Sequence, residues 1–318
     1  MEHVSDILDE MCMQEIKPID TGILFLDKMI GGYFPGEMTT LCGEEVDSKK
    51  AFVVHQVCHI AIDQKIPTLV LLNYENERKF LSLMITYYYS IRRDGLYDIF
   101  SNEEYQNVIA DFKVKLKESS LYIVKSVFFE DKSVIEEIDR FVAAKNIKIM
   151  FLSEVILDLR RKDDIDTLCS IRTIAIRRNI SLVVSVNVWN DREGVEYMRP
   201  SLRDLGIGSY VHGHDVVIGF TDYDEYGYWI DGQFVEEELE AAAPHSSLYG
   251  KVALEILKPQ EDVVKRLCYF PRDFFFLRDY SLKEQQKLKY IERKGGKGAK
   301  KLIRKLDLVL DEEWKNPS

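Results

Sequence analysis

Short apolar runs alternate with amphipathic segments along most of this chain. Runs rich in aliphatic and β-branched residues predict buried strands at residues 38–42, 67–75, 119–125, 147–152, 181–187, 215–221 and 251–258. Apolar residues at helical spacing predict helices at residues 51–62, 132–146 and 163–178, and two more within residues 78–118. Alternating strands and helices are typical of an α/β fold, in which helices flank a mostly parallel central sheet.

The connection between the first predicted strand and the following helix resembles a phosphate-binding loop. Residues 38–54 read MTTLCGEEVDSKKAFVV, to be compared with the pattern G-x-x-x-x-G-K-[ST]. Gly43 opens the loop and Lys49 occupies the lysine position, but Ser48 replaces the second glycine and Lys50 replaces the Ser/Thr. Backbone N–H groups at a helix N-terminus and the helix dipole favour a bound phosphate. Residues 43–50 are therefore the candidate nucleotide-binding loop.

Several loop residues oppose this chemistry. Ser48 has a Cβ, so a positive φ at that position would be strained. Lys50 donates hydrogen bonds and cannot ligate a cation. Val46 is neutral, but Glu44, Glu45 and Asp47 surround the expected anion site with negative charge. An ordinary strand-to-helix turn with a solvated lysine pair is the alternative interpretation, and this stretch by itself leaves both open.

Composition narrows the class of protein. With 318 residues, 46% hydrophobic and 31% charged, the chain suits one large globular domain with short appendages. No apolar run approaches the roughly 18 residues of a membrane span. Five scattered cysteines without a C-x-x-C pair argue against zinc and disulfides and predict a cytoplasmic protein. The net charge of -11 disfavours nonspecific nucleic-acid binding by the chain as a whole.

Residues 21–37, TGILFLDKMIGGYFPGE, carry a family resemblance. The pattern T-G-x-x-x-L-D-x-x-x-G-G-x-x-P-G-[ED] resembles the RecA-fold ATPases, most of all the C-terminal motor domain of DnaB-type replicative DNA helicases. The resemblance covers residues 20–280, between an N-terminal helix or linker (1–19) and a basic helical tail (281–318). It implies a RecA-like P-loop NTPase fold with a C-terminal antiparallel hairpin at residues 266–277. It also implies ATP and Mg²⁺ as cofactors, and single-stranded DNA and a hexamer-like homo-oligomeric ring as partners.

The resemblance assigns catalytic positions, several of which carry an unexpected residue. Glu75 matches the glutamate that polarises the attacking water, although a solvated carboxylate at a strand end is the alternative. Ser153, followed by a glutamate, stands where the family has the aspartate of the Mg²⁺ shell, and a hydroxyl is a poor substitute. Asn187 replaces the glutamine that senses the γ-phosphate. Lys258 is retained from a K-x-R pair that closes a neighbouring subunit's site, but Gln260 replaces its arginine.

Two regions are candidates for nucleic-acid contact. Arg199 and Arg203 lie in a stretch that resembles the family's R-P-x-x-x-D-L, just before a DNA-facing loop at residues 206–213. Residues 283–305 contain ten Lys or Arg against two Glu, a local net charge of +8. The candidate contacts in this tail are Lys289, Arg293, Lys294, Lys297, Lys300 and Lys301. A solvated extension is the alternative interpretation of the tail.

Two further patterns are more typical of structure than of a site. The aromatic run at residues 87–89 is expected in the core rather than as a base-stacking platform. His212 and His214, beside Asp215, are expected to cap a loop and face water, and we predict no metal site there.

These observations predict a DnaB-like ATP-binding protein of DNA replication or recombination with impaired ATPase and helicase activity. ATP binding is expected to be weak or lost, and the Mg²⁺ site is in doubt because of Lys50 and Ser153. The alternative is a pseudo-ATPase that serves as a nucleic-acid-binding or oligomerisation module without turnover. A sensor or recombinase-loader relative is a third hypothesis, because one fold supports many functions.

Overall fold

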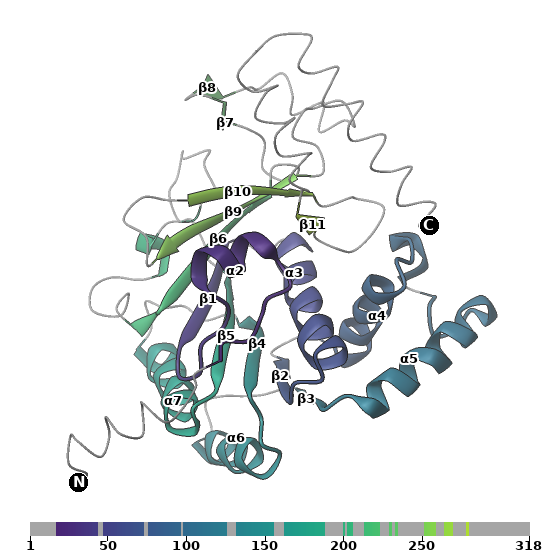
Figure 1. The fold of residues 1–318 in the computed structure, drawn as a ribbon, viewed down its shortest axis with the longest axis horizontal. Helices are drawn as coiled ribbons and strands as arrows, with labels where there is room; N and C mark the ends of the chain where they lie inside the picture. The colour runs from purple at the N-terminus through teal and green to yellow at the C-terminus, as the bar shows by residue number, and fades with distance from the viewer. Residues whose placement is uncertain are drawn as a thin grey trace.

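A central sheet with helices on both faces organises the molecule (Figure 1). The structure is a computed structural model. It describes residues 17–43, 47–72, 76–96, 98–125, 132–155, 162–187, 200, 202–205, 213–222, 229–230, 233–234, 251–258, 264–269 and 278–279.

The sheet joins nine strands of these described residues in the order β11-β10-β9-β6-β1-β5-β4-β2-β3. The parallel strands are β1 (Met38–Gly43), β2 (Thr68–Leu72), β3 (Leu121–Lys125), β4 (Ile149–Val155), β5 (Ser181–Asn187) and β6 (Val216–Asp222). The antiparallel strands are β9 (Lys251–Lys258), β10 (Val264–Tyr269) and β11 (Arg278–Asp279). A separate pair is formed by β7 (Trp229–Ile230) and β8 (Gln233–Phe234). The mostly parallel sheet and the antiparallel C-terminal hairpin are thus confirmed.

The helices fall mainly where the apolar spacing predicts them. The α-helices are α2 (Leu24–Ile30), α3 (Asp47–Val57), α4 (Glu77–Tyr88), α5 (Gln106–Glu118), α6 (Lys132–Ala144) and α7 (Lys162–Arg178). Short 3-10 turns occur at η2 (Arg93–Leu96), η3 (Glu103–Tyr105) and η4 (Leu202–Leu205). The predicted helix at 51–62 differs in two respects: α3 begins earlier, at Asp47, and after Val57 it continues as a π-helical segment, η1 (Cys58–Asp63). The short helix α2 was not predicted.

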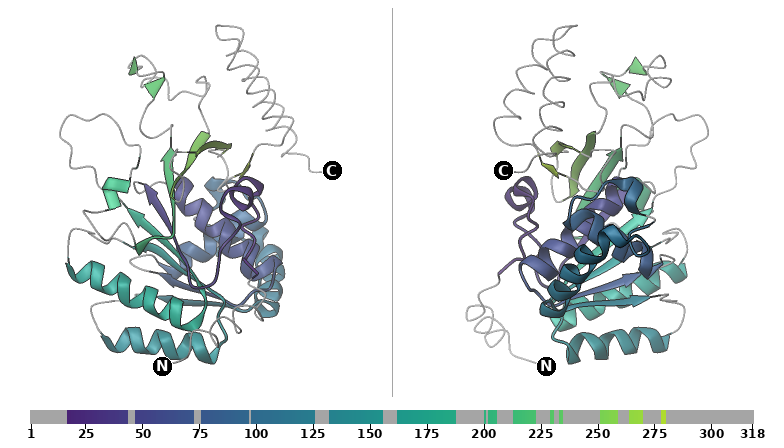
Figure 2. Two further views of the ribbon diagram at one scale, coloured as in Figure 1. Left: turned by 60° about the vertical axis from the view of Figure 1, so that its left-hand side comes forward. Right: turned by 90° about the vertical axis from the view of Figure 1, so that its right-hand side faces the viewer.

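Alternate residues of each parallel strand serve opposite faces of the sheet. In β2, Val70 and Leu72 belong to the core shared with α3 and α4, whereas Leu69 and Leu71 belong to the core shared with α6 and α7. Successive side chains of a strand point to opposite faces, and both faces are covered here. This arrangement explains why the strands read as continuous apolar runs. Figure 2 shows the two helical layers on either side of the sheet.

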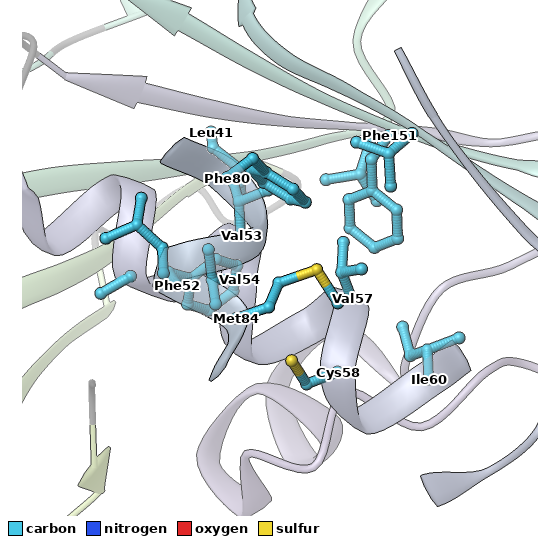
Figure 3. Close-up of a cluster of buried hydrophobic side chains, with 14 of the residues drawn as sticks. Leu41, Phe52, Val53, Val54, Val57, Cys58, Ile60, Phe80, Met84 and Phe151 are labelled. Carbon is cyan, nitrogen blue, oxygen red and sulfur yellow. The ribbon is translucent and has the colours of Figure 1, made fainter. Parts of the chain in front are cut away.

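The core beneath α3 holds the start of that helix against the sheet. Phe52 packs edge-on against Phe220 of β6, with ring centroids 5.2 Å apart. Val53 and Val57 are buried in the same cluster as Leu41 of β1 (Figure 3). The aromatic residues 87–89 pack against this cluster as partly buried side chains, which confirms their structural role.

The end of α3 and the π-helical segment that follows it contact residues 20–22. Gln56 donates a hydrogen bond to the carbonyl of Thr21 over 2.8 Å, and His59 contacts the Asp20 carboxylate at 3.2 Å. Gly22 has φ of +71°, and a Cβ built on it would lie 2.7 Å from the His59 ring. The positive φ therefore favours glycine at this position, and a Cβ would also displace the His59 ring.

Two predictions lie outside the described residues: the basic tail at 281–318, and the N-terminal helix or linker at 1–19, of which only residues 17–19 are described. Among the described residues, no helix is both long enough and apolar enough to cross a membrane.

Candidate nucleotide-binding site

Gly43 and the first turn of α3 form the two sides of the candidate loop. Gly43 is the last residue of β1, and α3 begins at Asp47. A Cβ at Gly43 would lie 2.8 Å from the carbonyl oxygen of Phe220 on β6. Real Cβ atoms essentially never approach a backbone atom so closely, so β1 and β6 can meet here only because this residue is glycine.

Lys49 points back into the protein from the first turn of α3. Its side chain is fully buried, with 0% exposure. The ammonium group donates hydrogen bonds to the carbonyl oxygens of Gly43, at 3.1 Å, and Val186, at 2.9 Å. A further bond reaches Oδ1 of Asn187 over 2.5 Å. Lys49 thereby joins the carboxyl ends of β1 and β5, the edge of a parallel sheet where ligands bind in open α/β folds.

The register of the sheet creates this arrangement. Gly43 of β1 lies opposite Asn187 of β5 in the parallel pair. The two strand ends therefore finish side by side, and both offer oxygens to the same ammonium group. The structure brings together three of the predicted nucleotide-binding residues, Gly43, Lys49 and Asn187.

Ser48 and Lys50 flank Lys49 within the helix. Ser48 lies in α3, which begins one residue earlier, and it does not have a positive φ, so the strain that such a φ would cause does not arise. Its side chain is fully buried, and Oγ has no hydrogen-bond partner among the described residues. An unsatisfied buried hydroxyl costs about 1–3 kcal/mol. Lys50 is also buried, with 8% exposure, which contradicts a solvated lysine pair.

The described residues do not fit a Mg²⁺ ion. Ser153 is 1% exposed on β4, opposite Leu72 of β2, and offers a hydroxyl where a carboxylate is needed. Lys50 places a positive charge where the motif has a Ser or Thr that would ligate the ion. Mg²⁺ is usually held through one or two carboxylates together with water and phosphate oxygens. No group of three or more His, Cys, Asp or Glu among the described residues could hold a metal.

A second polar cluster lies near the beginning of β6, towards the amino ends of the parallel strands and away from the loop. His214 is buried, and its Nδ1 forms a 2.6 Å hydrogen bond with Oγ1 of Thr40. Burial, with the nearby positive charges of Lys258 and Arg172, lowers the pKa of His214 to about 4. The expectation that His214 faces water is therefore wrong, because the chain packs it between β1 and the surrounding polar groups. Asp215 receives a hydrogen bond from the backbone N–H of Met38.

Lys258 belongs to this second cluster. It ends β9 and donates a hydrogen bond from its ammonium group to the carbonyl oxygen of His214. Because β9 runs antiparallel to β6, its last residue lies near the beginning of β6, opposite Val217. Lys258 is therefore positioned away from the loop of its own chain.

The remaining candidates cannot be located at the level of side chains. Arg203 lies in η4, but its side chain is outside the described part. Asp47 is the first residue of α3, and its side chain is also outside the described part. The other candidates outside the described residues are Glu44, Glu45, Val46, Glu75, Arg199, His212, Gln260, Lys289, Arg293, Lys294, Lys297, Lys300 and Lys301.

Solved structures have a similar overall fold. A solved ATPase domain superposes with a TM-score of 0.68 at 14% identity, over 87% of this chain and 97% of that one. A DnaB-like replicative helicase, solved to show its interactions with primase, gives 0.65 at 15% identity, over 88% and 68%. The chain has a RecA-like fold. The KaiC-like protein PH0186 of Pyrococcus horikoshii is a more distant match to this fold, with a TM-score of 0.53 at 17% identity, over 84% and 100%.

No family model and no curated protein sequence matches the chain. Likeness at identities of this level establishes the RecA-like fold, and the function has to be argued from the site itself.

Sequence reasoning missed the internal partners of the loop. It assigned Asn187 to a phosphate and Lys49 to the same phosphate, but did not anticipate that the two side chains bond to each other. The acceptor at Val186 is a backbone carbonyl, so the residue type at this position gives no indication of the bond. The pairing of Thr40 with His214 was also missed; a polar residue in the middle of the apolar run at 38–42 was the available signal.

Proposed function

We propose that this chain is a DnaB-like RecA-fold protein of DNA replication or recombination that binds ATP weakly and hydrolyses it slowly or not at all. The observation that carries the proposal is the assembly of Gly43, Lys49 and Asn187 at the carboxyl ends of β1 and β5. A lysine at this point is suited to the β- and γ-phosphates of a nucleotide.

Weak binding is supported by the present position of the lysine. Its ammonium group is already satisfied by oxygens of the protein, so a phosphate must replace contacts that exist without it. The carboxylates of Glu44, Glu45 and Asp47 in the connecting sequence oppose an anion electrostatically. Both effects lower the affinity for ATP, although the lysine that would contact its phosphates is still present.

Slow turnover is supported by the chemistry of the two altered positions. Lys50 and Ser153 replace the protein groups that the resemblance assigns to the Mg²⁺ shell. Gln260 stands where the resemblance places an arginine, and an arginine finger is worth about 10³–10⁵ in kcat. Each replacement by itself is expected to slow hydrolysis. Without a bound Mg²⁺ ion and an arginine to position the phosphates, a glutamate at position 75 has no correctly placed water and phosphate to activate.

The second candidate is a pseudo-ATPase that keeps the fold as a nucleic-acid-binding or oligomerisation module. The specific observation in its favour is that Lys49 is buried and saturated by internal oxygens, as expected of a lysine with a structural task. In either case we propose single-stranded DNA as the nucleic acid, a ring-like homo-oligomer as the assembly and the cytoplasm as the location.

Calorimetric titration of the full chain with ATP separates the two candidates. Heat of binding that is lost in Lys49→Ala supports the nucleotide-binding protein. A matched control is Lys65→Ala, because Lys65 is 61% exposed and pairs with Glu118 away from the loop. Absence of binding in the wild-type chain, at ATP concentrations up to the millimolar range, would support the pseudo-ATPase instead.

A further inference from the structure

We propose that Asn187 is a latch: its side-chain oxygen holds Lys49 in the nucleotide-free loop and competes with a triphosphate for the lysine. This inference rests on the proposed nucleotide-binding function and adds a regulatory contact to the same site. In it, Asn187 acts on the nucleotide through Lys49 and is a positioning residue.

The latch begins with a match between donors and acceptors. A lysine ammonium group has three N–H donors. Among the described residues, Lys49 donates to the backbone carbonyl oxygens of Gly43 and Val186 and to the side-chain oxygen of Asn187. The lysine can contact a phosphate fully only after it leaves some of these acceptors.

Burial makes this exchange costly. Lys49 is fully buried, and Asn187 is 4% exposed. A hydrogen bond to a charged group is stronger in such surroundings than at the surface, because water does not screen it. The lysine is thus more firmly held than a solvent-exposed lysine, which could turn towards a nucleotide without losing protein contacts.

Asn187 is the adjustable member of the three acceptors. The carbonyls of Gly43 and Val186 are fixed by the strands β1 and β5, whatever their side chains. The Asn187 amide is supplied by a side chain, so a change of residue alters the hold on Lys49 while both strands remain. Alanine at position 187 would remove the acceptor and release Lys49, whereas aspartate would hold the lysine more strongly through its negative charge.

A purely structural role for the same contact makes a different prediction. If Asn187 only stabilised the strand ends, its loss would lower the stability of the chain and leave nucleotide affinity unchanged or weaker. A latch predicts a tighter complex with nucleotide when the contact is removed, because the lysine no longer has to be released.

Two measurements on the full-length protein test the latch. The first is acetylation of Lys49 by an amine-reactive ester, followed by mass spectrometry, with exposed Lys65 as the internal reference. The second is calorimetric titration with ATP and with inorganic tripolyphosphate, both without Mg²⁺, so that the altered metal positions do not enter. The variants are Asn187→Ala and Asn187→Asp. Asn102→Ala is the matched control, because Asn102 caps η3 away from the loop.

The expected result has opposite signs in the two variants. Asn187→Ala should raise the acetylation rate of Lys49 several-fold and tighten ATP and tripolyphosphate binding by roughly tenfold, the loss of one hydrogen bond to a charged group. Asn187→Asp should lower both, and Asn102→Ala should change neither. The aspartate variant keeps the test decisive if the alanine variant does not fold.

Three other outcomes overturn the proposal and are distinguishable. Unchanged Lys49 acetylation in both Asn187 variants rules out the latch itself. Changed acetylation with unchanged, measurable ATP affinity shows that the contact is structural and leaves the proposed function standing. Absence of ATP and tripolyphosphate binding in every variant, including a well-folded Asn187→Ala, overturns the proposed function together with the latch.

Discussion

The ammonium group of Lys49 and the amide oxygen of Asn187 are bonded across 138 positions of sequence, at 2.5 Å. The contact joins the first turn of α3 to the end of β5. The lysine that would contact a nucleotide phosphate is therefore already hydrogen-bonded to oxygens of the protein.

We expect phosphate release from ATP to remain near the background rate, with and without single-stranded DNA. The physical reason is that Lys50 and Ser153 replace the two groups that the family resemblance assigns to Mg²⁺, and that Lys49 is already bonded to oxygens of the protein. A coupled phosphate-release assay measures this. Robust turnover that disappears in Lys49→Ala would contradict the prediction and show an intact ATPase.

Restoring the expected residues should repair metal-dependent binding. The triple variant Ser48→Gly, Lys50→Thr and Ser153→Asp introduces a hydroxyl and a carboxylate suited to Mg²⁺ and removes a buried hydroxyl that has no hydrogen-bond partner among the described residues. We expect affinity for ATP with Mg²⁺ to rise roughly tenfold, or about 1.4 kcal/mol. Titration of the same variant with excess EDTA is the control. Equal affinity of wild type and variant would indicate that the pocket itself is closed.

Gly43→Ala should destabilise the chain by roughly 1–3 kcal/mol, the usual cost of overpacking. The added Cβ would lie 2.8 Å from the backbone carbonyl of Phe220, which cannot move aside as a flexible side chain does. Urea unfolding measures the effect. Gly213→Ala is the matched control, because a Cβ there meets only the end of the Arg172 side chain, at 3.8 Å. Similar loss of stability in both variants would refute the steric argument.

Acid should destabilise the protein through two buried histidines. The pKa of His214 and that of His55 are each lowered to about 4, chiefly by burial. Both must be neutral in the fold, whereas the unfolded chain protonates them near pH 6.5. Their stabilisation is therefore complete above about pH 6.5 and is lost as the pH falls towards 4. Near pH 5 unfolding should take up about one extra proton per histidine, or about 1.4 kcal/mol per pH unit for each.

Urea unfolding between pH 4.5 and 7.5 measures this dependence. His214→Gln and His55→Gln should each reduce the pH slope of the unfolding free energy by about one proton, independently of the carboxylates. If neither variant alters the slope, the histidines are not the groups that titrate.

The basic tail at residues 283–305 is expected to carry nucleic-acid affinity. Binding of single-stranded DNA should weaken steeply with salt, with a log–log slope of about −0.7 per phosphate neutralised. Stacking by Tyr290 would add roughly 1–3 kcal/mol per base. Fluorescence anisotropy with a truncation after Tyr280, checked for folding by circular dichroism, measures the tail's share. If instead these lysines only cover acidic surface, exposed ion pairs of that kind contribute little.

A charge-only variant complements the truncation. Substituting Lys297, Lys300 and Lys301 with glutamine removes positive charge and keeps the chain length. It should reduce the salt slope by about two units. A folded truncation that binds as tightly as the full chain, with the same slope, would shift the contact to the loop at residues 206–213.

Local pattern was sufficient for most of the elements. The predicted strands at 181–187 and 251–258 have the bounds of β5 and β9, because a buried strand requires a continuous apolar run wherever it lies. The exceptions among the helices are α2, which the apolar spacing did not predict, and the π-helical segment after Val57. In the π-helical segment, His59 contacts Asp20 across 39 positions of sequence, which no local window contains.

The sequence by itself determined the identity of the loop residues and the parallel α/β character of the fold. Glycine at 43 and lysine at 49 are local features, as are the unsuitable groups at 50 and 153. The tertiary structure decided what these residues touch. Strand order sets β5 beside β1 and gives Lys49 the Asn187 oxygen, and it sets β6 on the other side and buries His214 against Thr40. Such pairings depend on register between strands far apart in the chain, so only the assembled sheet defines them.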